Sequence, residues 1–169
     1  MEIVEFETLS LSDWVALIRH DTRAFGAETA GIELRKMDHY VGARDDEGRL
    51  QAVIGAATVQ VTVDGHDPFE VVGIGGLLVH RGARGLGLGR ELMGRMRKVT
   101  AQWGPDRALL FCEDHLLATY GRRGYIELSD PVWVDQPTGP MIMPTHAMWR
   151  PIRPSHWPAG TIHVHGLPF

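Results

Sequence analysis

The chain has 169 residues, of which 44% are hydrophobic and 22% charged, with a formal net charge of −4 and a single cysteine, Cys112. This composition is typical of a globular protein that buries a sizeable core, and the negative charge argues against bulk binding to nucleic acid. One cysteine excludes an intrachain disulfide, and the N-terminus lacks the basic and apolar regions of a signal peptide, so we expect a cytoplasmic protein with no membrane segment.

The N-terminal segment predicts a strand followed by a helix. A strand over 3–9 is indicated by its apolar residues, Ile3, Val4, Phe6 and Leu9. Ser10 is a typical N-cap and begins a helix whose apolar positions extend toward Phe25. The next segment, 26–36, predicts either a short helix around 28–35 or a loop.

Two hairpin signals follow. Strands are expected over 40–44 and 50–63, joined by a turn at Asp46-Glu47-Gly48. Gly65 marks the next turn, and a valine-rich and glycine-rich strand is expected over 69–79. Together these segments predict an antiparallel start to the sheet.

The second half of the chain alternates more evenly between helix and strand patterns. In chain order we expect a helix over 88–103, a strand over 108–112, a helix over 116–123, strands over 125–128 and 131–134, a loop over 136–145 and a last core strand over 147–152. The remaining residues, 153–169, are apolar enough to pack as a short C-terminal extension. We therefore predict an α/β (α+β) fold with one domain, 1–152, and a packed tail, 153–169.

A glycine-rich turn connects the strand over 69–79 to the longest helix. It runs from His80 to Arg90 and contains Gly82, Gly85, Gly87 and Gly89. A turn of this kind leaves backbone N–H groups unpaired at a helix N-terminus, where the helix dipole is positive, so phosphate is the natural ligand. Arginines at both ends of the turn add fixed positive charge.

Two common phosphate loops do not fit this turn. A P-loop requires Lys followed by Ser or Thr after its last glycine, whereas Leu88-Gly89 follows Gly87. A dinucleotide fingerprint requires a third glycine where this chain has Arg90. A purely structural glycine turn between strand and helix is the remaining alternative.

The pattern Arg84-x-x-Gly87-x-Gly89, directly after Leu77-Leu78-Val79, resembles the pyrophosphate loop of the GNAT superfamily of acyl-CoA-dependent N-acetyltransferases. The resemblance implies a central mixed, twisted sheet flanked by helices, and acetyl-CoA as co-substrate. The cofactor-binding residues that it implies are Leu77, Leu78, Val79, Arg84, Gly85, Leu86, Gly87, Leu88, Gly89 and Arg90.

A second segment, Tyr120-Gly121-Arg122-Arg123-Gly124-Tyr125, is similar to the family's Tyr-x-x-x-Gly-aromatic segment. The resemblance implies that Tyr120 is the general acid that protonates the leaving thiolate of coenzyme A. A positioned phenol can do this without carrying a competing charge. The alternative for Tyr120 is a tyrosine at the edge of the core.

The sequence leaves three options for the general base: a carboxylate away from the fourth strand, a water held by backbone carbonyls, or no base at all. Family members often carry a glutamate on the fourth strand, where this chain has Gly75. Glu113, beside Asp114 and just past the fifth strand, is the first candidate catalytic base, with a solvated acidic turn as the alternative. Cys112 is expected to be a small buried residue rather than a nucleophile.

Within the superfamily, the layout is most similar to aminoglycoside N-acetyltransferases, especially in Pro137-Thr138-Gly139-Pro140. Glu28 and Glu33 lie in the segment that lines the acceptor site in that family, and acidic groups suit a cationic amine. The leading hypothesis is direct acetyl transfer to a primary amine of a small molecule. A non-catalytic protein that binds acyl-CoA or sequesters a ligand is the alternative, and a hydroxyl or a protein N-terminus is another acceptor.

We expect no metal site. His163-x-His165 places two imidazoles on one face of a strand, but without a recognisable carboxylate or cysteine partner we interpret the pair as structural. The expected partners are a small-molecule amine, neither nucleic acid nor membrane, and a homodimer of the kind common in the family.

Overall fold

The computed structural model describes residues 1–18 and 29–169. The chain divides into two compact units, which are described separately. The first unit comprises Met1–Phe25, Met37–Ala57 and Gly75–Trp103, and the second comprises Gly26–Lys36, Thr58–Ile74 and Gly104–Phe169. Two long strands, β3 (Leu50–Val63) and β4 (Phe69–Val79), are each divided between the units. The start of β3 and the end of β4 belong to the first unit, and the remaining residues of both strands belong to the second.

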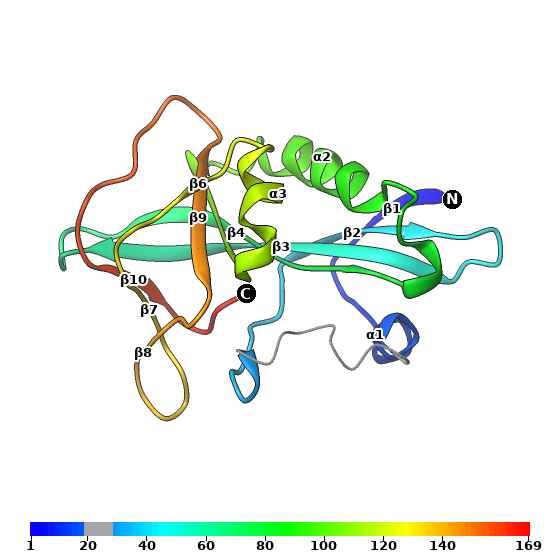
Figure 1. The fold of residues 1–169 in the computed structure, drawn as a ribbon, viewed down its shortest axis with the longest axis horizontal. Helices are drawn as coiled ribbons and strands as arrows, with labels where there is room; N and C mark the ends of the chain where they lie inside the picture. Colours follow the sequence, from blue (N-terminus) through cyan, green and yellow to red (C-terminus); the bar gives the residue numbers. More distant parts are fainter. Residues whose placement is uncertain (19–28) are drawn as a thin grey trace. The chain divides into compact units, whose positions relative to one another are not determined.

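The first unit begins with an antiparallel meander. Strand β1 (Glu2–Phe6) pairs with β2 (His39–Arg44), and β2 pairs with β3, which lies beside it in the view of Figure 1. Helix α2 (Leu88–Thr100) packs against β2. Its buried residues, Leu88, Leu92, Met96 and Thr100, repeat every four positions, as the predicted amphipathic stripe requires.

Helix α1 (Leu11–Ile18) begins where the sequence predicts. Ser10 Oγ accepts the N–H of Asp13 at 3.0 Å, so the side chain caps one of the N–H groups at the start of the helix. Leu17 packs in a buried cluster with Leu50, Val53 and Leu78. The helix is thus held by one cap and by one apolar face.

The second unit is built around a mixed sheet with the strand order β6-β9-β5-β4-β3-β10-β7-β8. The pairs β4–β5 and β7–β10 are parallel, and the pairs β5–β9, β6–β9, β3–β10 and β7–β8 are antiparallel. The strands are β5 (Arg107–Cys112), β6 (Ile126–Glu127), β7 (Val132–Val134), β8 (Met141–Ile142), β9 (His146–Pro151) and β10 (Ile162–His165). A 3-10 turn, η3 (Asp114–Leu116), leads into the short helix α3 (Leu117–Gly121).

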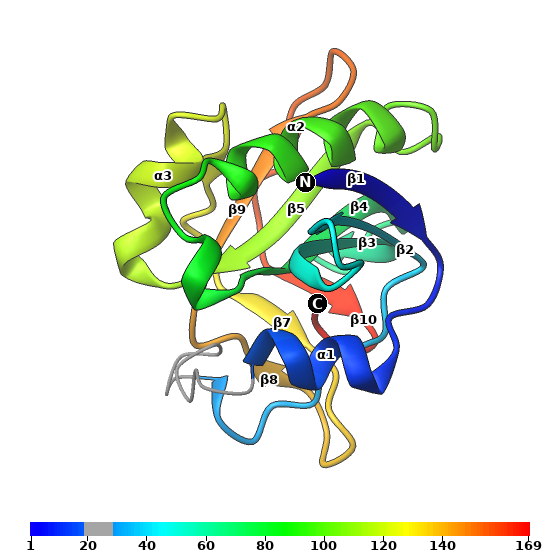
Figure 2. The same cartoon turned by 90° about the vertical axis from the view of Figure 1, so that its right-hand side faces the viewer.

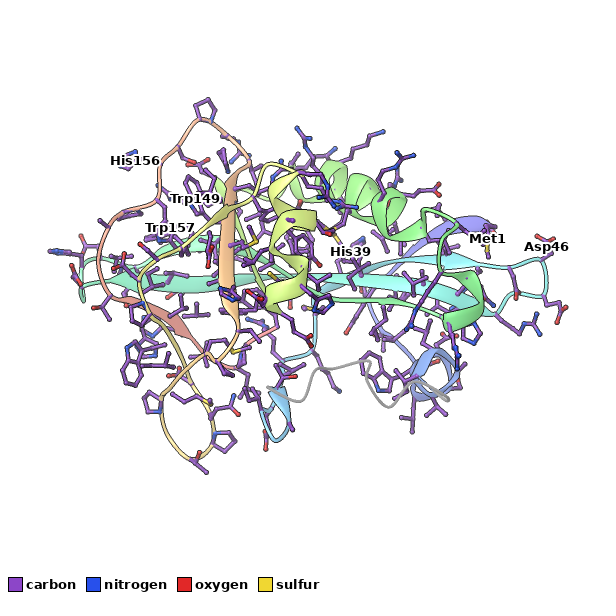
Figure 3. The ribbon with its side chains drawn as sticks, in the orientation of Figure 1. Met1, His39, Asp46, Trp149, His156 and Trp157 are labelled. Atoms are coloured by element: carbon purple, nitrogen blue, oxygen red, sulfur yellow. The ribbon has the colours of Figure 1, made fainter. Side chains whose placement is uncertain are left out.

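Aromatic side chains from the C-terminal residues complete the core of the second unit. Phe169 is 6% exposed and its ring centroid lies 5.1 Å from that of Phe111. A Cβ atom at Gly73 of β4 would lie only 2.7 Å from the Phe169 ring, so this glycine permits the close approach. The rings of Trp149 and Trp157 lie 5.6 Å apart and are labelled in Figure 3.

Most predicted elements are confirmed, and β3 and β4 have the predicted bounds. The predicted loop over 136–145 is wrong in part, because Met141–Ile142 pairs with β7 and forms β8. Residues 32–36 adopt no helix, which favours the loop alternative, and Phe25 lies outside the described residues. In the tail, Ile162–His165 forms β10 between β3 and β7. None of the helices in the described residues is long and apolar enough to span a membrane.

Candidate functional site

The glycine-rich turn between β4 and α2 is held by its own polar groups. Residues Arg81–Ala83 form a 3-10 turn, η2, and the Nδ1 atom of His80 accepts the N–H of Gly82 at 3.2 Å. Arg84 Nε donates to the carbonyl oxygen of Val79 at 3.3 Å. His80 is therefore part of the turn, as the sequence suggested.

The N-terminus of α2 presents a run of unpaired amides. Among the described residues, the N–H groups from Gly85 to Gly89 donate to no protein acceptor, although the Gly87 carbonyl accepts from Arg90 and Glu91 at 3.0 and 3.1 Å. Gly87 is the N-cap and has no side chain to cap the helix. Unpaired amides at the positive end of a helix are suited to binding an anion such as phosphate.

Glycine is required in this turn by its backbone conformation. Gly85 and Gly87 have φ values of 83° and 79°, in the left-handed region that side chains disfavour. No heavy atom lies within 4 Å of a Cβ built at either residue, so the space beside them is open. Arg81, Arg84 and Arg90 are exposed around the same turn.

Strand β4 carries its own irregularity close to this turn. Gly76 has a φ of 61°, which breaks the regular extended conformation of the strand. The end of the strand from Gly75 onward, the turn and the helix together form one continuous feature of the first unit.

A family comparison covers the segment that contains this feature. The profile of the Acetyltransferase (GNAT) domain matches residues 5–127, which include the strand, the turn, the helix and Tyr120. The chain belongs to the GNAT acetyltransferase family. It is an acyl-CoA N-acetyltransferase by family, and its co-substrate class is acyl-CoA.

Solved structures agree with this assignment at the level of the fold. The GNAT family N-acetyltransferase YhbS from Escherichia coli, solved in complex with CoA, has a TM-score of 0.65 at 19% identity, covering 96% of this chain and 89% of its own. An acyl-CoA N-acyltransferase from Pseudomonas aeruginosa has a TM-score of 0.58 at 24% identity, covering 88% and 98%. The ribosomal-protein-S18-alanine N-acetyltransferase from Escherichia coli has a TM-score of 0.57 at 15% identity, covering 94% and 97%. No curated protein matches the chain. The GNAT fold with its mixed sheet is thus confirmed.

In this GNAT protein, Tyr120 lies on α3 in the second unit. Its ring packs edge-on against Tyr125 with centroids 5.9 Å apart, and the N–H of Tyr125 donates to the Tyr120 carbonyl at 3.2 Å. The hydroxyl is bonded to no other described residue. Burial raises the pKa of the Tyr120 phenol, and the nearby Cys112 adds to the shift. The phenol is therefore a neutral proton donor at physiological pH.

Cys112 ends β5 and is 6% exposed. Burial, together with the carboxylates of Glu127 and Glu113, raises the pKa of the thiol to about 11. The side chain is a thiol rather than a thiolate at neutral pH, which agrees with its expected role as a small buried residue.

Glu113 follows Cys112 and is half-buried at the start of η3. Its Oε2 atom lies 3.2 Å from His115 Nδ1. His146 of β9 lies opposite Cys112 in the strand register. No pattern in the sequence singles out this histidine. Its Nδ1 lies 2.7 Å from Glu127 Oε1, and its Nε2 lies 3.4 Å from Asp114 Oδ1.

Of the two glutamates expected at the acceptor site, Glu33 is described and Glu28 lies outside the described residues. Glu33 is exposed, and its backbone is held by the side chain of Gln136 on both sides. Gln136 directly precedes the Pro137–Pro140 loop. The structure therefore brings together two segments that the sequence linked to the acceptor separately.

The His163-x-His165 pair has a carboxylate partner, which was not predicted from the sequence. Asp135, which follows β7, places Oδ1 at 2.8 Å from His163 Nε2, while its Oδ2 accepts the N–H of Gly166 at 2.7 Å. That backbone bond is the main reason that the pKa of Asp135 lies below its usual value, with His163 contributing. No sequence pattern links Asp135 to this pair, because the two segments meet only through the pairing of β7 with β10.

Proposed function

We propose that the protein transfers an acetyl group from acetyl-CoA to a primary amine of a small molecule, by direct attack of the amine on the thioester. The observation that carries this proposal is the run of unpaired amides from Gly85 to Gly89 at the start of α2. A sequestering protein and an enzyme would share this feature, so the catalytic groups must distinguish them.

The cofactor is assigned to β4 and the turn. The backbone of Leu77, Leu78 and Val79 pairs with the pantetheine arm, and the turn from Arg84 to Gly89 holds the pyrophosphate, with Arg90 beside it. Backbone N–H groups and arginines are both suited to phosphate oxygens. This assignment is supported by the open space beside Gly85 and Gly87.

Tyr120 supplies the proton that the leaving group needs. The amine nitrogen attacks the thioester carbonyl, the C–N bond forms as the C–S bond breaks, and the phenol protonates the CoA thiolate. A half-buried hydroxyl that is engaged by no described side chain, with a raised pKa, supports this role.

Glu113 is assigned as the base that removes the proton from the attacking amine, because Gly75 cannot serve. Its half-buried carboxylate, close enough to Cys112 to raise the pKa of that thiol, supports the assignment. The carboxylate can take the proton directly or through water.

The acceptor is assigned to the aminoglycoside-like class of cationic amines. The support is the exposed carboxylate of Glu33 and the attachment of its backbone through Gln136 to the Pro137–Pro140 loop. Acidic side chains raise the local concentration of a cationic amine and favour it over a neutral one. Glu28 belongs to the same assignment on sequence grounds.

Calorimetry with CoA and a thiol-release assay over an amine panel test the proposal. We expect acetyl-CoA to bind and at least one amine, including aminoglycosides, to release CoA. Binding without turnover on any amine would favour the sequestering alternative, for which the missing glutamate at Gly75 is the specific argument. The absence of any CoA binding at low salt would contradict both functions. We further propose a cytoplasmic location and a homodimer, which size-exclusion chromatography with light scattering would test.

A further inference from the structure

The second unit carries a cluster of potential metal ligands that has no part in the function proposed above. It consists of Asp135 after β7 and of His163 and His165 on β10, which share one face of the strand. One ligand atom from each residue lies within 4.8 Å of the others. Figure 2 shows the strands that bring them together, β7 and β10, side by side.

The two imidazole rings lie close to each other and to the carboxylate of Asp135. Their ring centroids are 4.5 Å apart with planes 34° from parallel. His163 Nε2 lies 2.8 Å from Asp135 Oδ1, and His165 Nε2 lies 3.0 Å from Thr62 Oγ1. The cluster is thus one carboxylate and two imidazole nitrogens, of which His165 is exposed to solvent.

We propose that Asp135, His163 and His165 form a binding site for a divalent transition-metal ion, with Zn²⁺ as the favoured ion. Two histidine nitrogens and one carboxylate oxygen are a typical ligand set for Zn²⁺, which binds such atoms at about 2 Å and completes a tetrahedron with water. Hard ions such as Mg²⁺ and Ca²⁺ prefer all-oxygen sites and suit this set poorly.

Binding requires only local adjustment. The ion replaces the proton between His163 Nε2 and Asp135 Oδ1, and the neutral His163 ring then carries its proton on Nδ1. Ligand atoms around a tetrahedral Zn²⁺ are roughly 3.3 Å apart. The His163 Nε2–Asp135 Oδ1 pair, at 2.8 Å, therefore opens slightly, whereas separations of up to 4.8 Å in the cluster close by up to about 1.5 Å. Asp135 Oδ2 keeps its bond from Gly166, which orients the carboxylate from outside the metal.

The ion has a definable structural effect. Asp135 follows β7, whereas both histidines belong to β10, so a bound ion cross-links the two parallel strands near the C-terminus. Because the ion binds the folded chain, it raises the melting temperature as its concentration rises. This effect is independent of acetyl transfer, so the inference stands or falls separately from the proposed function.

The test is a titration of the full chain with ZnCl₂, after removal of metal with EDTA and dialysis, followed by calorimetry. Co²⁺ provides a second readout, because visible absorption reports its ligand geometry. We expect one ion per chain and a Zn²⁺-dependent rise in melting temperature. The substitution His165→Gln, which removes the exposed ligand, should weaken Zn²⁺ binding by at least about tenfold. Even the loss of a group that only orients a metal ligand typically costs about that factor in affinity.

His146→Gln is the matched control, because it removes an imidazole that also has carboxylate neighbours. Binding should be unchanged in this variant. The proposal is overturned if the wild-type chain binds no Zn²⁺ at a concentration of about 10⁻⁴ M. A dissociation constant above that value would be far weaker than those of structural zinc sites. It is also overturned if His165→Gln, with an unchanged metal-free melting temperature, binds Zn²⁺ as tightly as the wild type.

Discussion

Gln136 holds the backbone of Glu33 by two hydrogen bonds: its Oε1 accepts the Glu33 N–H at 2.8 Å, and its Nε2 donates to the Glu33 carbonyl at 3.0 Å. The two residues are 103 positions apart in the chain. The side-chain amide of Gln136 thus forms the two hydrogen bonds that the backbone of a neighbouring strand would form in a sheet. It does so for a segment that has no regular secondary structure. The position of the assigned acceptor segment therefore depends on one side chain.

Gln136→Ala tests that dependence. Loss of both bonds should lower the free energy of unfolding by about 1–2 kcal/mol. In the proposed enzyme it should raise the KM for the amine several-fold and leave the KM for acetyl-CoA unchanged. Steady-state kinetics with each substrate varied in turn provides the measurement, and Gln60→Ala, at an exposed glutamine of β3, is the control. An equal rise in both KM values would contradict a specific role at the acceptor.

Gly87→Ala should impair CoA binding through backbone strain. A side chain at a φ of 79° costs about 1–2 kcal/mol and would tilt the amides of the turn, so CoA affinity should fall at least about tenfold by calorimetry. Gly94 is an exposed glycine inside the same helix with open space at its Cβ. Gly94→Ala should therefore stabilise the protein by about 0.5–1 kcal/mol without changing CoA affinity. Equal affinities in both variants would remove the turn from the cofactor site.

Tyr120→Phe keeps the ring contact with Tyr125 and removes only the hydroxyl. We expect kcat to fall about 100-fold with the KM for acetyl-CoA unchanged. Because burial raises the pKa of the phenol, wild-type kcat should not decline from Tyr120 ionisation until the pH exceeds the ordinary tyrosine pKa of 10.0. A pH–rate profile checks this, and Tyr40→Phe is a control for hydroxyl loss. An unchanged kcat across pH in Tyr120→Phe would contradict the assigned role.

The Asp13–Arg44 ion pair should make stability depend on acid pH. Arg44 donates to both carboxylate oxygens, at 3.1 and 2.9 Å, and these bonds hold the pKa of Asp13 below 3.8. The stabilisation is therefore complete above about pH 5 and is lost as the pH falls through the lowered pKa. Asp13→Asn should destabilise the protein by about 1 kcal/mol at pH 7, with the difference vanishing in strong acid.

Thermal melts of wild type and variant between pH 7 and acid pH measure this difference. Asp46→Asn is the control, because Asp46 is fully exposed and lies 3.7 Å from the N-terminal amine of Met1, the two residues labelled at one end of Figure 3. Its melting curve should match the wild type at every pH. A constant difference between Asp13→Asn and wild type over the whole range would contradict the ion-pair explanation.

Gly73→Ala should show that the C-terminal residue packs directly on β4. The added Cβ would lie 2.7 Å from the Phe169 ring, and overpacking of this kind costs about 1–3 kcal/mol. In the Phe169→Ala background, the same substitution should cost much less, because its obstacle is gone. Chemical unfolding of the four proteins in this double-mutant cycle measures the coupling. Additive effects would mean that the two residues do not touch.

Local patterns in the sequence determined the elements that carry their own signal. Strands β3 and β4, the capped start of α1 and the glycine turn before α2 were predictable, because residue spacing, capping groups and backbone preferences act between near neighbours. The turn also led to the family. Strand β8 was missed because two residues become a strand only by pairing with β7.

Only the tertiary structure decided which distant residues meet. Three contacts join segments that are remote in the sequence. Glu33 pairs with Gln136, His146 lies opposite Cys112, and Asp135 approaches His163 and His165. Such contacts follow from burial of the whole core and from the strand order of the sheet, which no local spacing encodes. The sequence therefore determined the glycine-rich turn and the family, whereas folding decided what surrounds Tyr120 and where the proposed metal ion would bind.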